Sequence, residues 1–199
     1  MNDAVSATLD DAAKLAGPLA RAFHDDPMFA WILPDASTRT ASLEGFFGAL
    51  ARHVFLPAGT SVRLPDHAGA ALWLPPGVGT ARPGAVFAVP GILGAFGTRL
   101  VAALPLFLEM ELAHPREDHH YLGVLGIDPP AQGKGLSKPL LAPTLARADA
   151  EGMPAYLETA KATNVAYYRR FGFEVKKEVR LKDAPPMWCM LRAPRGRPA

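Results

Sequence analysis

The chain has 199 residues, 49% hydrophobic and 20% charged, enough to bury a sizeable core in one domain, with or without an additional lobe. A formal net charge of +2 does not indicate a nucleic-acid partner. Cys189 is the single cysteine, which excludes a disulfide framework and a cysteine-based metal site, and we expect no metal.

Targeting and membrane signals are not visible in the sequence. The acidic start, MNDAVSATLDDAAKLAG, has neither the basic nor the apolar region of a secretory signal. The longest apolar stretch, 85–97, is interrupted by Pro90, Gly91 and Gly94 and is shorter than the roughly 20 residues of a membrane span. We therefore expect a cytoplasmic protein that does not associate with membranes.

The first half of the chain begins with helical patterns. Apolar residues recur at helical spacing over 9–33 and again over 37–55. Gly17-Pro18 interrupts the first pattern, which predicts one kinked helix or two short ones, and 24–27 (HDDP) is predicted to be a turn.

The middle of the chain changes to strands and back. Residues 61–77 (SVRLPDHAGAALWLPPG) predict two strands joined by a hairpin turn at 66–69. The glycine- and proline-rich stretch 77–97 gives no clear prediction. Helical spacing returns over 98–112, and 114–119 is predicted to be a polar connection.

The last third has the clearest pattern. It predicts strands at 120–127, 154–159, 173–181 and 187–192, with helices at 137–151 and 164–171. Strand, helix and strand within about 40 residues form a βαβ unit, so part of the sheet is expected to be parallel.

The stretch DPPAQGKGLS (128–137) lies where a strand leads into a helix. A helix N-terminus offers unpaired N–H donors and a partial positive charge, which suit a phosphate group. Gly133 and Gly135 allow the backbone to approach the phosphate oxygens, and the side chains of Gln132 and Lys134 add a donor and a positive charge.

Three phosphate-binding patterns compete for this loop. A P-loop requires Ser or Thr where Gly135 stands and Gly where Asp128 stands, and a dinucleotide fingerprint requires Gly in place of Lys138. The pattern Q/R-x-x-G-x-G/A fits with one departure, Ser137 in the last position. That hydroxyl could cap the helix or contact phosphate.

A second motif follows at 164–173, where NVAYYRRFGF matches N-x-x-[FY]-Y-x-x-x-G-F. The two motifs in this order resemble the GNAT (GCN5-related) N-acetyltransferase superfamily. The run 123–175, with MWCM at 187–190, is similar to its puromycin N-acetyltransferase-like actinobacterial members. The resemblance implies an α/β (α+β) fold: a mixed, mostly antiparallel central sheet with a splayed parallel pair, and helices on both faces.

The resemblance also implies how the chain is organised. One acyltransferase domain is expected over 1–192, with a variable acceptor-binding part at 1–115, an acetyl-CoA-binding part at 116–192 and a flexible tail at 193–199. Acetyl-CoA is the implied co-substrate. The residues implied to bind it are Leu125, Gly126, Ile127, Gln132, Gly133, Lys134, Gly135, Leu136, Ser137, Asn164 and Tyr168.

Within this set, the family places specific roles on particular residues. Leu125, Gly126 and Ile127 are expected to pair with the pantetheine arm, and their N–H groups could stabilise the oxyanion. Gly126 is expected to form a β-bulge, the alternative being a glycine needed only for close packing. Asn164 is expected to cap the following helix and contact the cofactor.

Two residues are expected to be catalytic. Tyr168 is predicted to protonate the departing sulfur, because a phenol remains protonated near neutral pH, whereas Tyr167 is expected only to pack. Glu158, at the end of a strand, is predicted to take the proton of the amine. Alternatives for this base are Glu111, His119, His120 or a water molecule, and a covalent route through Cys189 is disfavoured.

The sequence therefore predicts a direct, acetyl-CoA-dependent transfer of an acetyl group to a primary amine of a small molecule, such as an aminonucleoside or another amine antibiotic. Two alternatives remain: a protein or peptide N-acetyltransferase, and a non-catalytic module that binds acyl-CoA. The expected partner is the small-molecule amine, with no nucleic acid, and both monomer and homodimer remain open.

Overall fold

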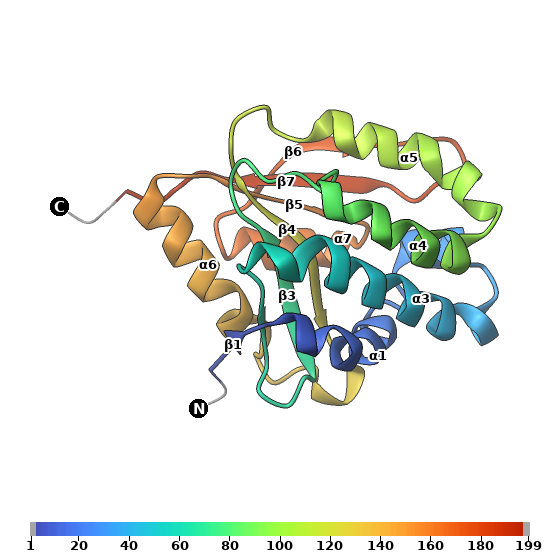
Figure 1. The fold of residues 1–199 in the computed structure, drawn as a ribbon. Coiled ribbons are helices and arrows are strands. Elements are labelled where there is room, and N and C mark those ends of the chain that lie inside the picture. The colour runs from blue at the N-terminus through green and yellow to red at the C-terminus, as the bar shows by residue number, and fades with distance from the viewer. Residues whose placement is uncertain (1–2, 197–199) are drawn as a thin grey trace.

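A seven-stranded sheet forms the centre of the computed structural model, which describes residues 3–196 (Figure 1). The strands lie in the order β1-β2-β3-β4-β5-β7-β6. Their bounds are β1 Val5–Ser6, β2 Val62–Arg63, β3 Gly69–Leu74, β4 His120–Ile127, β5 Ala155–Thr159, β6 Glu174–Val179 and β7 Met187–Arg192. Among the described strands, β4 and β5 pair in parallel and all other neighbours are antiparallel.

Helices cover both faces of the sheet. They are α1 Ala12–Ala22, α2 Pro27–Ile32, α3 Ala36–Leu50, α4 Val89–Phe96, α5 Arg99–Ala113, α6 Ser137–Glu151 and α7 Ala162–Arg169. Shorter helical segments are the 3-10 helices η1 Leu9–Asp11, η3 Leu56–Ala58, η4 Pro83–Ala88 and η5 Pro129–Ala131, and the π-helix η2 Ala51–Phe55. The predicted fold class, a mostly antiparallel mixed sheet with one parallel pair, is thus confirmed.

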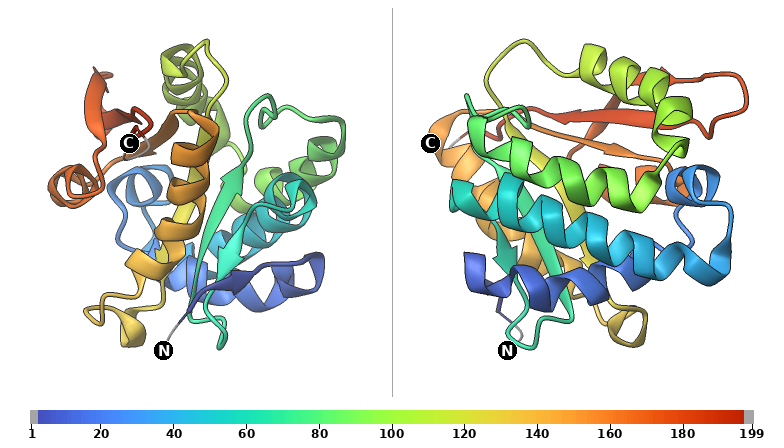
Figure 2. Two further views of the ribbon diagram at one scale, coloured as in Figure 1. Left: turned by 90° about the vertical axis from the view of Figure 1, so that its left-hand side faces the viewer. Right: turned by 45° about the vertical axis from the view of Figure 1, so that its right-hand side comes forward.

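The two faces have separate cores because side chains alternate along each strand. Figure 2 shows α1, α3, α4 and α5 side by side across one face, with α6 and α7 on the other. On β3, Ala70 and Leu72 pack toward the α1 and α3 face, whereas Ala71 and Trp73 pack toward α6 and α7. Within residues 3–196, every helix is too short or too polar to cross a lipid bilayer.

Most of the predicted elements occur. Of the two alternatives for the N-terminal helix, one kinked helix or two short ones, the structure has a single helix. Helix α1 continues through Pro18 instead of separating into two helices. Gly17 removes the Cβ that would collide with the proline ring, which eases this passage. The stretch 77–97, which gave no prediction, forms η4 and α4. Residues 197–199 of the predicted tail lie outside the described residues. Within the described part of the tail, the Arg195 amide donates to Asp149 Oδ1 at 2.6 Å.

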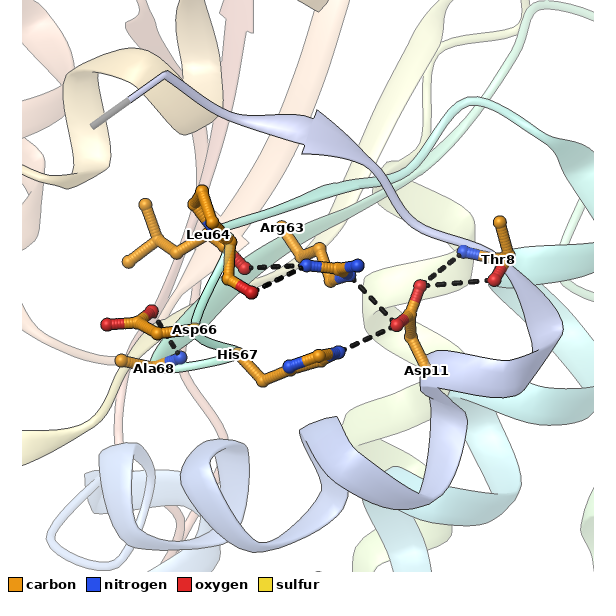
Figure 3. Close-up of polar contacts among 8 residues, drawn as sticks. Thr8, Asp11, Arg63, Leu64, Asp66, His67 and Ala68 are labelled. Carbon is orange, nitrogen blue, oxygen red and sulfur yellow. Dashed lines mark hydrogen bonds and ion pairs between the residues drawn. The ribbon is translucent and has the colours of Figure 1, made fainter. Parts of the chain in front are cut away.

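Asp11 holds the N-terminal segment against the β2–β3 hairpin (Figure 3). The residue is 4% exposed, and its carboxylate accepts the Thr8 N–H at 2.8 Å. Its Oδ1 lies 2.7 Å from His67 Nε2 and 2.9 Å from Arg63 Nε. Burial raises the pKa of Asp11, but the contacts from Thr8, His67 and Arg63 outweigh burial and hold the pKa far below its ordinary value.

The Asp11→Asn variant is expected to lower the free energy of unfolding by about 2 kcal/mol at pH 7, because a neutral amide loses the charge-assisted contacts. The folded pKa of Asp11 is lower than the unfolded one. Its stabilisation is therefore complete above a pH of about 4 and is lost as the pH falls below that value.

Urea unfolding at pH 7 and pH 3 measures both effects, with the exposed neighbour changed in Asp10→Asn as the control. The gap between wild type and Asp11→Asn should narrow at pH 3. Equal stability of the two variants at pH 7 would contradict the role of Asp11.

Candidate active site

A V-shaped opening forms where β5 separates from β4. The two strands pair only from His120 to Leu122 against Ala155 to Leu157. Beyond that point β4 continues along β3 and β5 continues along β7. The opening therefore presents strand backbone on the β4 side that has no strand partner.

A bulge at Gly123 begins the opening. Leu72 pairs with Val124 and Trp73 with Leu122, which leaves Gly123 as the extra residue of β4. A Cβ at this position would lie 2.2 Å from the ring of Phe55, so only glycine fits. The bulge increases the local twist of β4 at the point where it leaves β5.

The predicted bulge at Gly126 is wrong, because Gly126 pairs regularly with Ala70. A Cβ on Gly126 would lie 2.6 Å from Leu19 Cδ2 and 3.3 Å from the Cβ of Ala22. Gly126 therefore allows α1 to pack closely on β4, which is the alternative that the sequence left open.

The backbone of β4 presents alternate peptide groups to the opening. The Asp128 N–H donates to Ala68 O at 2.7 Å, on the β3 side. Because peptide groups alternate along a strand, Gly126 also points toward β3, whereas Leu125 and Ile127 point into the opening. Two of the three predicted strand residues thus direct their peptide groups there, although the Ile127 carbonyl already accepts from the Gln132 side chain.

The glycine loop forms one wall of a cavity of about 290 Å³, called here the loop cavity. Gly133 (φ 76°) and Gly135 (φ 72°) adopt the left-handed conformation, which glycine reaches without strain. No atom lies within 4 Å of the Cβ that either would carry, so the loop is open to a ligand. Its lining residues are Ala22, Phe23, Asp26, Leu125, Gly126, Ile127, Gln132, Gly133, Gly135, Leu136, Ser137, Lys161, Asn164, Tyr167 and Tyr168.

This cavity brings together all the residues predicted to bind the cofactor except Lys134, whose ammonium donates to Pro130 O at 3.2 Å. Gln132 lines the cavity but donates its amide to Ile127 O at 2.9 Å. Arg21 and Asp128 form a two-bond ion pair, at 2.8 and 2.6 Å, that ties the start of the loop to α1.

Two predicted polar roles at the helix ends differ in the structure. Asn164 lies inside α7, whose N-cap is Lys161, and it donates to Thr159 Oγ1 at 3.2 Å. The capping prediction for Asn164 is therefore wrong. Ser137 does not cap α6 but contacts the hydroxyl of Tyr167, which lines the loop cavity and does not only pack in the core.

A second cavity of about 320 Å³, called here the aromatic cavity, lies on the α1 to α5 side of the opening. Helical segments form part of its wall, with residues from η4, α4 and α5. Its described lining contains no Lys, Arg or His, and its two carboxylates are Asp26 and Glu158. Six phenylalanines line it: Phe23, Phe29, Phe46, Phe47, Phe55 and Phe107.

The two cavities meet at five shared residues, Phe23, Asp26, Leu125, Asn164 and Tyr168. Burial raises the pKa of Tyr168 well above its ordinary value, with smaller contributions from Tyr167 and Asp26, so its phenol stays protonated at neutral pH. Burial also raises the pKa of Asp26, although Lys161 opposes this.

Glu158 faces the aromatic cavity from β5 and is nearly buried, with 4% of its side chain exposed. Its Oε1 lies 2.8 Å from His114 Nε2. Burial lowers the pKa of His114, but Glu158, together with Glu111, outweighs burial and leaves that pKa above its ordinary value.

The other candidates for a base lie elsewhere. Glu111 and His119 line a third cavity of about 270 Å³, called here the outer cavity. His120 is fully buried on the far side, with its Nε2 2.8 Å from Glu151 Oε2. Cys189 is also fully buried and lines none of the three cavities, and burial raises the pKa of its thiol. Among residues 3–196, no group of three or more His, Cys, Asp or Glu residues could hold a metal ion.

Two residues of the site were missed by the sequence analysis. Asp26 lies in a stretch read only as a turn, and His114 in one read only as a polar connection. The signal for Asp26 was the sequence Asp-Pro before an apolar run, since its carboxylate caps α2 by accepting the Met28 N–H at 3.0 Å. No sequence signal links His114 to Glu158, which are 44 positions apart (158 − 114).

Comparisons with known proteins agree with this geometry. A family model described as the acetyltransferase (GNAT) family matches residues 80–173. An uncharacterized N-acetyltransferase of Schizosaccharomyces pombe is 28% identical over 201 residues, covering 92% of this chain and 80% of that protein.

Solved structures share the fold over nearly the whole chain. A Corynebacterium glutamicum protein described as histone acetyltransferase HPA2 and related acetyltransferase superposes with a TM-score of 0.72 at 24% identity, covering 99% of this chain and 98% of that one. Arylalkylamine N-acetyltransferase 2 of Aedes aegypti gives 0.65 at 16% identity, covering 96% and 97%. The motifs, the fold and these matches together support placing the chain in the GNAT acetyltransferase superfamily.

Proposed function

We propose that this protein is an acetyl-CoA-dependent N-acetyltransferase that moves an acetyl group directly to a primary amine of a small molecule. The observation that carries this proposal is the meeting of two unlike cavities at Tyr168. One is open, has a glycine loop and suits phosphate. The other has helical segments in its wall, is lined by aromatic side chains and suits an organic acceptor.

The loop cavity fits coenzyme A by the chemistry of its walls. The N-terminus of α6 and the left-handed Gly133 and Gly135 present backbone donors to a diphosphate. The peptide groups of Leu125 and Ile127 face the opening, where an extended pantetheine arm can pair with them as a strand would. Bound acetyl-CoA supplies an activated acetyl thioester at the end of this arm.

Tyr168 is the proposed acid. It lies at the boundary of both cavities, and its raised pKa keeps the phenol protonated at neutral pH. The phenol would donate its proton to the sulfur that leaves, while Leu125 N–H can donate to the carbonyl oxygen at the same junction.

Glu158 is the proposed base, and Asp26 the second carboxylate facing the acceptor. Both lie in a cavity that is otherwise mostly apolar. The carboxylates attract a cationic amine, and the apolar remainder of the wall can contact the apolar part of the same molecule. This chemistry fits an aminonucleoside, another amine antibiotic or an arylalkylamine, the substrate class after which the Aedes aegypti structural relative is named.

A protein or peptide acceptor is the second candidate, since one structural relative is described as a histone acetyltransferase. The presence of η4, α4 and α5 in the wall of the aromatic cavity favours the small molecule, because a peptide needs a groove that remains open along its length.

Release of free thiol from acetyl-CoA tests the proposal. The panel contains apolar primary amines, an aminonucleoside, a polyamine and a lysine peptide. We expect release with at least one small apolar amine and little with the polyamine or the peptide. Coenzyme A binding without thiol release for every amine would instead indicate a module that binds acyl-CoA without turnover.

The Gly133→Ala variant tests the glycine loop. An alanine there has room but must adopt φ near +76°, which costs about 1 to 2 kcal/mol, so we expect the Kd for coenzyme A to rise about tenfold. The control is Gly152→Ala at the other end of α6, where φ is 68° and space is equally open. Gly152→Ala should lose a similar amount of folding stability and keep the wild-type Kd for coenzyme A. An unchanged Kd in Gly133→Ala would argue against phosphate binding at this loop.

The Tyr168→Phe variant tests the acid. We expect kcat to fall about a hundredfold with the Kd for coenzyme A nearly unchanged, because only the proton donor is removed. Tyr167→Phe is the comparison, because it loses the Ser137 contact in the loop cavity and should raise the KM for acetyl-CoA instead. Unchanged turnover in Tyr168→Phe would remove Tyr168 from this role.

A further inference from the structure

We propose that His114 relays the proton that Glu158 takes from the amine and releases it into the outer cavity. The proposal rests on the proposed function and adds an exit route for the proton. Glu158 lines the aromatic cavity, His114 lines the outer cavity, and the two side chains are 2.8 Å apart. The pair therefore connects the two cavities.

Glu158 needs such a route because its own surroundings are closed. Only 4% of its side chain is exposed, so bulk water cannot remove a proton from it directly. Tyr121 and Tyr156 lie nearby, but burial, with the Glu158 charge, raises both phenol pKa values, so these groups stay protonated and cannot take the proton up. The imidazole of His114 is the adjacent group that can accept and release a proton near neutral pH.

The outer cavity is suited to receive the proton. Its wall is polar, with Glu111, Arg116, Glu117, Asp118 and His119 beside His114. In contrast to Glu158, the His114 side chain is 19% exposed. Carboxylates on this wall stabilise the imidazolium while it lasts, and water that enters the cavity can then take its proton.

The proton balance of the relay is closed. The ammonium group loses one N–H proton to a Glu158 oxygen, which frees the nitrogen lone pair to form the bond to the acetyl carbon. As the carbon–sulfur bond breaks, the sulfur takes the Tyr168 proton, and a second proton lost by the nitrogen restores the Tyr168 phenol. The Glu158 carboxyl then passes its proton to Nε2 of neutral His114, and the imidazolium releases one proton to water in the outer cavity. Glu158 and His114 return to their starting states, and no oxidant or further reactant is required.

The charged and titratable groups facing His114 come from α5, β4, β5 and the segment between α5 and β4. They are Glu111 on α5, Tyr121 on β4, Tyr156 and Glu158 on β5, and Arg116, Glu117, Asp118 and His119 in the segment. The carboxylates raise the pKa of His114, whereas burial lowers it, and their net effect places it above the ordinary value of 6.5. A protonated His114 cannot accept from Glu158, so turnover should fall as the pH drops through this pKa.

The test compares kcat against pH for wild type and His114→Gln with the same saturating amine, measured by thiol release. We expect at least about tenfold slower turnover at neutral pH in His114→Gln, loss of the acidic limb of the profile, and partial rescue by added imidazole. His53→Gln is the matched control, since it removes a histidine that lines none of the three cavities, and it should keep both the rate and the acidic limb.

A binding readout separates a relay from a structural role. His114→Gln should keep wild-type affinity for coenzyme A, because it lies outside the loop cavity. By NMR titration in the absence of amine, Glu158→Gln should lower the pKa of the His114 imidazole. An unshifted His114 pKa would overturn the coupling on which the relay depends.

The outcomes also separate the two proposals. An active wild type with unchanged rate and pH profile in His114→Gln would overturn the relay alone. A wild type that releases no thiol with any amine would overturn the proposed function, and the relay with it.

Discussion

The departure of β5 from β4 after Leu122 and Leu157 determines where every other part of the site lies. In a continuous sheet, the peptide groups of Leu125 and Ile127 would bond to a neighbouring strand. Because β5 diverges, a stretch of strand backbone remains available to a ligand inside the protein, where an unpaired peptide group is costly unless something else pairs with it. The bulge at Gly123, with the Phe55 ring packed against it, lies where this divergence begins.

The acceptor side depends on how rigidly the segment between α1 and α3 is held. Arg39 is 7% exposed and donates to three backbone carbonyls, those of His24, Leu33 and Pro34, at 3.0, 2.6 and 3.1 Å. These bonds fix both ends of the segment that carries α2. Asp26 caps that helix and lies at the boundary of the two cavities. The Arg39 guanidinium thus helps to position the Asp26 carboxylate, because it holds the backbone on both sides of it.

The last third of the chain was predictable because its signals are local. Period-two and helical patterns predicted β4, α6, β5 and β7 nearly to the residue, and the glycine loop indicated a candidate phosphate site at a strand-to-helix junction. The bulge could not be placed in the same way. Gly123 and Gly126 lie in the same strand, and only the register of β4 against β3 shows which one is the bulge. The base side depends on His114 meeting Glu158, a contact made by packing α5 across the sheet.

The distribution of charge explains why the two cavities can serve one reaction without competing for ligands. The loop cavity has Lys161 and the helix N-terminus, which favour an anion, and the aromatic cavity has Asp26 and Glu158 and no basic side chain among its described residues. A polyanionic carrier is therefore repelled from the acceptor side, and a cationic amine is drawn to it. Asp26 and Tyr168 lie where the loop cavity and the aromatic cavity meet. In the proposed reaction, this boundary is where the amine loses its charge and the thiolate gains its proton.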